Sequence, residues 1–264
     1  KAWDHSSFST YLSQAVEHEV GKTFFEEVVL LAKDNNLLSD EHFTVDGTLI
    51  EAWASMKSFV RKGSRAKAED EDRGNPSVNF RGEKRTNETH ESTTDPEARL
   101  MKKAAGKEAK LCFGAHALME NRNGLLMELK VTSATETTET KAAIGTLKEK
   151  KKERLMKAKT MGGDKGYHNA EFVGHLRKEG TRPHVAEVEG REVDGLDGRT
   201  TGGCGYAISQ RIRKRIEEIF GWVKTVGGFR KSRYRGIAKT QTNAYWVGAA
   251  YNLLRISRLQ VAPT

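Results

Sequence analysis

Three acidic residues in widely separated parts of the sequence are the groups best suited to chemistry. Asp46 lies within a run of β-branched and apolar residues, Asp164 follows a second short run, and Glu217 lies in a helical pattern. An acidic residue is unfavourable inside a strand, so Asp46 needs a reason. Because no histidine or cysteine accompanies them at ligand spacing, the three describe an oxygen-only site, which suits Mg²⁺ or Mn²⁺. Two such ions ~3.5–4 Å apart can activate a water or a 3′-hydroxyl and stabilise the leaving oxygen of a phosphodiester.

The stretch from Gln210 to Lys224 is predicted to form the helix that presents Glu217. Apolar residues recur there at helical steps, at Ile212, Ile216, Ile219 and Val223. A second stripe ~100° around the helix, at the edge of the buried face, holds Arg213, Glu217, Phe220 and Lys224, whereas Glu218 should point to solvent. The simplest alternative is an amphipathic helix with ordinary i,i+4 charge pairs.

Positive charge gathers around the same stretch. The 264 residues carry 45 Lys and Arg against 36 Asp and Glu, a net charge of +9. Residues 211–235 hold nine cations and two anions, so most of the excess flanks the predicted helix. Such a surplus is compatible with a polyanionic partner. The loop after the helix mixes aromatic residues with cations and fits a DNA contact through Arg230, Lys231, Arg233 and Arg235, with a solvated loop as the alternative.

The two cysteines, Cys112 and Cys204, are far apart and form no CxxC pair, which argues against a disulfide framework or a zinc knuckle. The sequence has no run of 18 apolar residues and no signal-peptide pattern. We therefore expect a soluble cytoplasmic protein. Because the chain opens with Lys1 and not with Met, we expect a fragment of a longer protein.

Hydrophobic periodicity predicts alternating strands and helices. A helical segment over 6–38 precedes a strand over 41–50, and a polar stretch over about 57–110 is predicted to be a mobile insertion. Two apolar runs around Asn121 to Gly124 predict a hairpin. The later elements are a helix over 137–156, a strand over 158–162, a helix capped by Asn169, a strand over 182–186, a loop over 187–208 and an apolar helix over 242–254. The lysines at 148–152 of the first of these helices are predicted to be solvated.

This order predicts an α/β fold, with a mixed sheet that begins with an antiparallel hairpin and is flanked by helices. Functional sites in open α/β sheets gather beyond strand ends, so Asp46 and Asp164 could converge there. Taken singly, Asp46 could be a buried, hydrogen-bonded strand residue and Asp164 a turn former. Asp194 and Asp197 are competing carboxylates, but the glycines beside them favour a loop.

Four segments, at 43–55, 116–121, 163–167 and 210–218, resemble bacterial insertion-sequence transposases of the DDE class, which have a ribonuclease H-like fold. Their glutamate helix bears a Tyr-x2-Arg-x3-Glu-x6-Lys signature. Arg213, Glu217 and Lys224 match its last three positions at the right spacing, while Gln210 stands at the tyrosine position and Tyr206 lies four residues earlier. The resemblance covers essentially the whole chain.

The resemblance implies that Asp46, Asp164 and Glu217 bind two Mg²⁺ or Mn²⁺ ions, and that Arg213 and Lys224 contact DNA or orient the site. The implied reaction is endonucleolytic nicking at transposon ends, followed by strand transfer of the freed 3′-hydroxyl into target DNA. It also implies a homodimer on DNA, associated with the bacterial nucleoid. Residues 1–40 would be the remnant of a longer helical region, and residues 41–264 the ribonuclease H-like catalytic domain with an insertion at about 57–109.

Three alternatives remain open at this point. The chain could be an inactive or truncated transposase-derived DNA-binding protein, which intact Asp46, Asp164 and Glu217 argue against. It could be a structural nucleic-acid scaffold, for which basic charge alone would suffice. It could also be a nuclease of the same fold that does not transpose.

Overall fold

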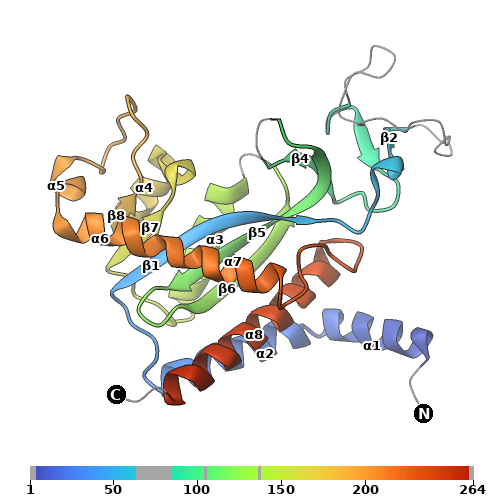
Figure 1. Ribbon diagram of the computed structural model, residues 1–264, viewed down its shortest axis with the longest axis horizontal. Helices are drawn as coiled ribbons and strands as arrows, with labels where there is room; N and C mark the ends of the chain where they lie inside the picture. Colours follow the sequence, from blue (N-terminus) through green and yellow to red (C-terminus); the bar gives the residue numbers. More distant parts are fainter. Residues whose placement is uncertain (1–3, 64–84, 104–105, 136–137, 262–264) are drawn as a thin grey trace.

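A six-stranded mixed sheet organises the computed structural model, which describes residues 4–63, 85–103, 106–135 and 138–261 (Figure 1). The strands are β1 (His42–Glu51), β4 (Arg99–Lys102), β5 (Ala109–Glu120), β6 (Leu125–Ser133), β7 (Thr160–Gly163) and β8 (Arg182–Val185). Their order is β4-β5-β1-β7-β8, and β6 also pairs with β5. In this sheet β1, β5 and β6 form an antiparallel meander, whereas β7 and β8 run parallel to β1.

Two crossover helices create the parallel half of the sheet. Helix α3 (Thr138–Lys152) joins β6 to β7, and α4 (Ala170–Lys178) joins β7 to β8. Asn169 caps α4 by accepting a hydrogen bond from the backbone N–H of Phe172, as predicted. Leaving β4 aside, the spatial order β6-β5-β1-β7-β8 is that of a ribonuclease H-like sheet, so the predicted fold class is confirmed.

Helices cover both faces of the sheet (Figure 1). Helices α3 and α4 pack on one face. The other face carries α6 (Cys204–Ile212), a 3₁₀ turn η3 (Arg213–Arg215) and α7 (Ile216–Lys224), while α8 (Ile237–Val261) lies against β6. The predicted apolar stripe is confirmed, since Ile216, Ile219 and Val223 are buried. The single helix predicted over 210–224 is wrong in detail, because the η3 turn divides it.

The N-terminal segment forms two helices and not the single helix predicted. Helix α1 (His5–Glu17) and α2 (Val20–Asp34) are separated at Glu19, whose φ of 50° is left-handed and cannot continue a right-handed helix. The predicted end of the helical run at Asn35 is confirmed. Helix α2 packs closely on α8, where a Cβ atom at Gly21 would lie 2.9 Å from the Thr242 side chain.

The polar stretch after β1 contains more structure than predicted. A 3₁₀ turn η1 (Met56–Ser58) leads into β2 (Phe59–Arg61), which pairs with β3 (His90–Ser92), and β4 joins the main sheet. The buried hydroxyls of Ser58 and Ser92 hydrogen-bond at 2.7 Å and tie the small sheet together. Residues 64–84 and 104–105 of the predicted mobile insertion lie outside the described residues, and most of the remainder is built into β2, β3, β4 and the turns beside them.

The predicted loop over 187–208 is shorter than expected. A short helix α5 (Gly198–Thr201) interrupts it and α6 begins at Cys204. Asp197 caps α5 by accepting a hydrogen bond from the backbone N–H of Arg199, so this competing carboxylate has a local structural role. The last helix, α8, is longer than the predicted 242–254. None of the described helices combines the length and apolar character needed to span a bilayer.

One lysine predicted to be solvated is buried. Lys150 is only 1% exposed, because its position on α3 faces β6. Its ammonium group lies 3.2 Å from the Glu128 carboxylate, 2.9 Å from that of Glu153 and 3.8 Å from that of Glu26. The neighbouring Lys148, Lys151 and Lys152 are exposed, as predicted.

Candidate active site

The structure brings Asp46 and Asp164 together at the centre of the sheet. Strand β1 pairs in parallel with β7, with Thr44 opposite Gly162, so the positions two residues further along lie at the same level. Both aspartates are half-buried. Burial raises the pKa of Asp46 to about 6, and the charges of Asp164 and Glu139 add to the rise; a hydrogen bond from Gly47 N–H, at 2.7 Å, and the charge of Arg213 oppose it.

Asp164 also shapes the turn that follows β7. Its Oδ1 atom accepts a hydrogen bond of 2.8 Å from the backbone N–H of Gly166, which caps the 3₁₀ turn η2 (Lys165–Tyr167). The turn-former interpretation is therefore correct for its local role. The same geometry places the carboxylate at the end of β7, where it acts electrostatically on Asp46.

Glu139, in the first turn of α3, is a third carboxylate at this point, and the sequence did not identify it. A Cβ atom at Gly47 would lie 2.6 Å from its Oε1 atom. A Cβ atom at Gly166 would lie 3.7 Å from its Oε2 atom and 3.0 Å from Oδ1 of Asp164. Glu139 thus lies between the two backbone segments that carry the aspartates. Burial, and then the charge of Asp164, raises its pKa, although the side chain remains exposed at one side.

A buried phenol lies close to the three carboxylates. Tyr167 is 1% exposed, and its hydroxyl has no hydrogen-bond partner within the described parts of the chain. Burial raises its pKa well above the usual value, and the charges of Glu139, Asp46 and Asp164 raise it further. A buried donor without a partner is costly and needs an explanation. An oxygen of a ligand, or a water molecule among the three carboxylates, would accept a hydrogen bond from the Tyr167 hydroxyl.

The stripe predicted on the glutamate helix faces the sheet, at β7 near its start and at β1 near its end. A Cβ atom at Gly162 would lie 3.4 Å from Cβ of Arg213. At the other end of the stripe, the Lys224 ammonium group donates a 2.5 Å hydrogen bond to Oγ1 of Thr48. Glu217 lies between these two cations in sequence and is exposed. Within the described residues it makes no hydrogen bond or ion pair, and its charge is not among those that shift the pKa of Asp46.

Gln210, at the signature's tyrosine position, supports Arg213. Its Nε2 atom donates to the backbone carbonyl of His184 at 2.5 Å, and its Oε1 atom accepts from Nε of Arg213 at 3.0 Å. Tyr206, four residues earlier, donates its hydroxyl hydrogen to the carbonyl of Val185 at 2.9 Å. Both side chains therefore attach α6 to β8, and Gln210 orients Arg213 through the hydrogen bond between them.

The basic loop after α7 is anchored from within and exposes its cations. Its backbone pairs with the end of β1, since Glu51 N–H donates to the Arg230 carbonyl and Ser232 N–H donates to the Glu51 carbonyl, at 3.1 and 2.7 Å. Phe229 and Ser232 are fully buried. The four cations predicted to contact DNA are all exposed: Arg230, Lys231, Arg233 and Arg235.

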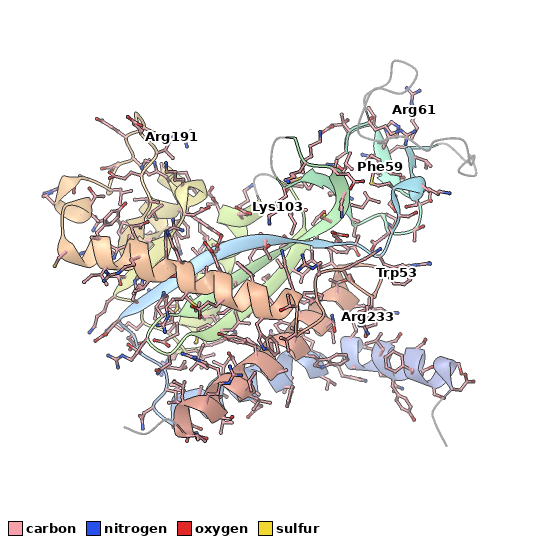
Figure 2. The ribbon with its side chains drawn as sticks, in the orientation of Figure 1. Trp53, Phe59, Arg61, Lys103, Arg191 and Arg233 are labelled. Carbon is pink, nitrogen blue, oxygen red and sulfur yellow. The ribbon has the colours of Figure 1, made fainter. Side chains whose placement is uncertain are left out.

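One of these cations lies beside an exposed aromatic residue. The Lys231 ammonium group lies 5.7 Å from the ring centroid of Trp53, within cation–π range. Arg233 lies on the same side of the molecule as Trp53 (Figure 2). Burial lowers the pKa of Lys224, and the charges of Lys103 and Arg230 lower it further. Positive charge therefore continues from the loop to the glutamate helix.

The acidic side chains have the donor chemistry for a hard divalent ion, but they do not converge on one point. Among the residues that the structure describes, no three histidine, cysteine or acidic side chains are placed to hold a metal ion together. Asp46, Asp164 and Glu139 offer only oxygen donors, as Mg²⁺ and Mn²⁺ prefer. The mutual repulsion of their charges and the unpartnered Tyr167 hydroxyl both fit a hydrated divalent cation.

Comparison with known proteins finds matches to a family model and to solved structures. Residues 77–253, more than half of the chain, match the family model described as "Transposase DDE domain". Two solved structures share 11% sequence identity with the chain: the Mos1 transposase paired-end complex with left transposon end, with a TM-score of 0.28, and a pre-cleavage Mos1 transpososome, with a TM-score of 0.26. The alignments cover 90% of this chain but only 59% and 60% of those chains. No curated protein matches the sequence.

Proposed function

The chain belongs to the family of transposases with a DDE domain, and from that premise we propose that it cleaves phosphodiester bonds at transposon ends and transfers the freed 3′-hydroxyl into target DNA. The observation that carries the proposal is the meeting of Asp46 and Asp164 on neighbouring parallel strands, with the pKa of Asp46 raised to about 6. Carboxylates with perturbed pKa values in a half-buried position are characteristic of functional sites.

Asp46 and Asp164 are the residues that would hold Mg²⁺ or Mn²⁺, and we infer two ions. When bound, such ions activate a water or a 3′-hydroxyl and stabilise the leaving oxygen of the phosphodiester. The chain's own part is to fix the donors. The β1–β7 pairing sets the level of the two aspartates, and hydrogen bonds from Gly47 and Gly166 orient one oxygen of each.

Glu217 is the third carboxylate that the family signature favours, and the helix contacts support it. Arg213 lies at the level of Gly162, which pairs with Thr44, while Lys224 reaches Thr48. Asp46 is two residues beyond Thr44, or ~7 Å along the strand. Glu217 is four residues beyond Arg213, or ~6 Å along the helix. The two carboxylates therefore lie at about the same level on facing elements.

Glu139 is the other candidate for the third carboxylate, and a specific observation favours it. Its oxygens already lie beside Gly47 and Gly166, the residues that orient the two aspartates. Glu217 has no such contact. Glu139 could bind an ion directly, or it could accept a hydrogen bond from a water on that ion.

The cations around the site would hold the DNA. Arg213 is oriented by Gln210, and Lys224 by Thr48. Arg230, Lys231, Arg233 and Arg235 are exposed on the anchored loop and would neutralise backbone phosphates. We further infer a homodimer on DNA, as strand transfer of two ends implies, which light scattering of the DNA complex tests. The division at residue 40 into a helical segment and a catalytic domain stays a prediction.

The decisive experiment is a nicking and strand-transfer assay with Mg²⁺ on a plasmid that carries the gene with its natural flanking DNA. Asp46→Asn and Asp164→Asn should reduce nicking to background and leave DNA binding intact, because each removes a metal ligand without removing a cation. Nicking by either variant at the wild-type rate refutes the proposed site. A wild-type chain that binds but does not nick would be an inactive relative, and nicking without strand transfer would indicate a plain nuclease.

The same assay identifies the third carboxylate. We compare Glu217→Gln with Glu139→Gln and use Glu218→Gln, one residue along the same helix and also exposed, as the matched control. Loss of nicking in Glu217→Gln alone assigns the ligand to α7, and loss in Glu139→Gln alone assigns it to α3. If both variants cleave like the Glu218→Gln control, the site needs no third carboxylate and this part of the proposal is wrong.

A further inference from the structure

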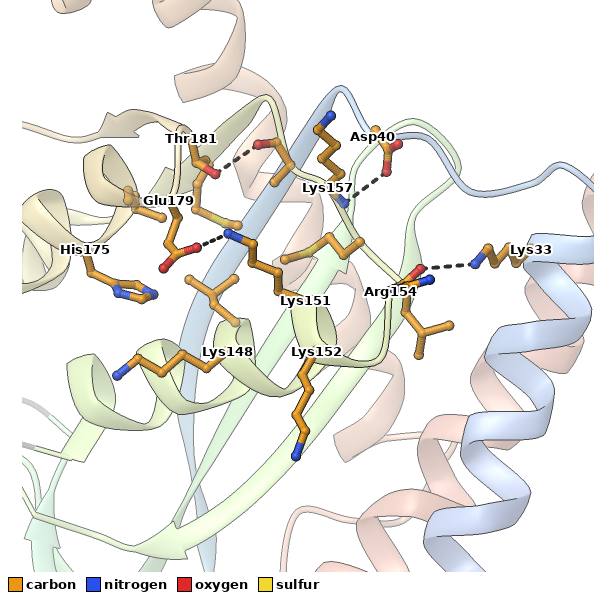
Figure 3. A pocket seen from close by; sticks show the side chains of 16 residues that line it. Lys33, Asp40, Lys148, Lys151, Lys152, Arg154, Lys157, His175, Glu179 and Thr181 are labelled. Carbon is orange, nitrogen blue, oxygen red and sulfur yellow. Dashed lines mark hydrogen bonds and ion pairs between the residues drawn. The ribbon is translucent and has the colours of Figure 1, made fainter.

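A cavity of about 910 Å³ opens at the end of β7 remote from the aspartates (Figure 3). It lies between the C-terminal end of α3, the start of β7, α4 and the end of α2. Because β7 begins beside the cavity and ends at Asp164, the two sites lie at opposite ends of one strand. The cavity has an apolar floor and a rim of six cations: Lys33, Lys148, Lys151, Lys152, Arg154 and Lys157.

The rim carries far more positive than negative charge. Its two acids are already engaged: Glu179 pairs with Lys151, and Oδ1 of Asp40 accepts a hydrogen bond of 3.2 Å from the backbone N–H of Lys157. Within the described ranges, no acid pairs with the ammonium groups of Lys148, Lys152 or Lys157. Burial lowers the pKa of His175 in the wall; the charge of Glu179 opposes this shift, and the charges of Lys148, Lys151 and Lys178 add to it.

The cations do not converge on one point. In Figure 3 the side chains of Lys148, Lys152 and Lys157 extend in different directions around the opening. A small anion such as free phosphate would need donors that meet at one place. Duplex DNA presents one negative charge per ~1.7 Å of its axis, so spaced cations can each neutralise a different phosphate. The arrangement therefore fits an extended polyanion.

Arg154 provides an independent observation. It stands just after α3 with a φ of 56°, a conformation that favours glycine. The N–H of Arg154 donates a hydrogen bond of 3.0 Å to the carbonyl of Lys151, and the N–H of Leu155 donates one of 3.1 Å to the carbonyl of Lys150. These two hydrogen bonds are typical of a helix end at which glycine usually occupies the position held here by Arg154. Its own carbonyl accepts a 3.1 Å hydrogen bond from Lys33. An arginine is thus held at the rim against its backbone preference, which suggests a function for its charge.

We propose that this basic cavity binds the phosphodiester backbone of duplex DNA, as a second contact apart from the aspartate site. The inference rests on the proposed function only for the identity of the polyanion. The ammonium groups of Lys148, Lys152 and Lys157 and the Arg154 guanidinium neutralise successive phosphates without reading sequence. A duplex held there is anchored at the far end of the strand that carries Asp164.

The test measures binding of a random-sequence duplex across a salt series by fluorescence anisotropy. Lys148→Gln with Lys152→Gln should weaken binding and reduce the slope of log K against log salt by about 0.9 for each phosphate that is no longer neutralised. Lys22→Gln, which removes the same charge from α2 outside the cavity, is the matched control. The proposal is overturned if the double variant keeps the wild-type salt slope. It is also overturned if the one charge removed in Lys22→Gln lowers the slope by as much as each charge removed in the double variant.

Arg154→Gly separates binding from folding. Glycine relieves the left-handed backbone, so the melting temperature should rise while DNA affinity and the salt slope both fall. A rise in melting temperature with unchanged DNA affinity means that Arg154 has no role in binding and contradicts the proposal. If the wild-type chain binds DNA but does not nick, the proposed function fails and this inference stands. If nicking is intact and the cavity variants bind like the wild type, the inference alone fails.

Discussion

At the scale of single residues, the candidate site is held at a cost to the fold. Asp46, Asp164 and Glu139 lie close together, and among the described residues Arg213 is the one cation whose charge lowers the pKa of Asp46. In the folded protein the protonated form of Asp46 is favoured up to a pH of about 6, whereas an ordinary aspartate ionises near 3.8. Above that pH the Asp46 carboxylate is ionised in the folded protein, where burial and the neighbouring charges make ionisation unfavourable. The unfolded chain does not carry this energetic cost. Active sites commonly retain such strain because the ligand relieves it.

Asp46→Asn should therefore stabilise the protein without metal at pH 7.5, while it abolishes cleavage. A pKa raised by about 2 units corresponds to at most ~3 kcal/mol, and solvent around this half-exposed group reduces that to roughly 1–2 kcal/mol. The gain should vanish below pH 4, where Asp46 is protonated in both states. Urea unfolding of the two proteins at pH 4 and pH 7.5 measures it. A variant less stable than wild type at pH 7.5 contradicts the repulsion described here.

At the scale of elements, the half-buried His42, beside the buried His184, fastens α6 to the sheet. Nδ1 of His42 lies 2.7 Å from Oγ1 of Thr160 on β7, and its Nε2 lies 3.0 Å from Oγ of Ser209 on α6. The ring of His184 lies 6.0 Å away. Burial lowers the pKa of both histidines to about 4; the charge of His184 adds to the effect on His42, and nearby arginines add to that on His184.

Stability should fall as the pH drops from about 6.5 to 4. In that range the unfolded chain takes up protons on both histidines and the folded chain does not, so a lower pH favours unfolding. Each of these two pKa shifts can lower the free energy of unfolding by up to ~3 kcal/mol. Urea midpoints between pH 7 and 4.5 measure the effect, and hydrogen exchange in α6 should rise first. His42→Gln should flatten the profile, and a profile as steep as wild type would remove the histidine explanation. Asp46 acts in the opposite direction over the same range, so Asp46→Asn should steepen the profile.

The buried Lys150 links three elements. It joins α3 to Glu128 on β6 and to Glu26 on α2. Its pKa is raised, because the charges of Glu128 and Glu153 outweigh burial, which alone would lower it. Lys150→Met should destabilise the protein by about 3–5 kcal/mol at pH 8, since Glu128 would remain buried without a partner.

Removing both partners tests that explanation. Lys150→Met combined with Glu128→Leu should recover most of the stability, because no buried charge then remains. Thermal or urea unfolding of the single and double variants gives the coupling energy. Equal destabilisation in the two variants would show that packing and not charge sets the cost.

At the scale of the whole molecule, the sheet separates an acidic site from two basic surfaces. Asp46 and Asp164 lie at the centre, the basic loop over 226–235 lies at the end of β1, and the basic cavity lies at the start of β7. Helix α8, packed on α2 and β6, secures the N-terminal helices to the main sheet. A folded state that binds divalent ions while the unfolded chain does not must gain stability from them.

Mg²⁺ should raise the melting temperature at pH 7.5, and EDTA should reverse the rise. A concentration 100 times the dissociation constant gives ~2.7 kcal/mol. The effect should fade toward pH 5, because Asp46, with its pKa of about 6, must be ionised to bind. Differential scanning calorimetry of wild type and of Asp46→Asn with Asp164→Asn makes the comparison. An equal rise in the double variant would place the ion elsewhere.

Local patterns in the sequence were enough to predict several features of the molecule. Alternation and the Asn121–Gly124 turn predicted the hairpin, and helical spacing predicted the buried face of α7. These depend on residues a few positions apart, whose side chains share a face because strand and helix periods are fixed. The basic loop was predicted from composition for the same reason.

Which distant residues meet became clear only from the folded chain. An acid in the first turn of a helix is common because it complements the helix dipole, so Glu139 gave no signal until the crossover placed α3 beside Gly47 and Gly166. Lys150 looked like any member of a lysine run until α3 packed on β6. The break at Glu19, the early start of α6 and the cavity likewise arise from packing between segments far apart in the chain, which local periodicity does not encode.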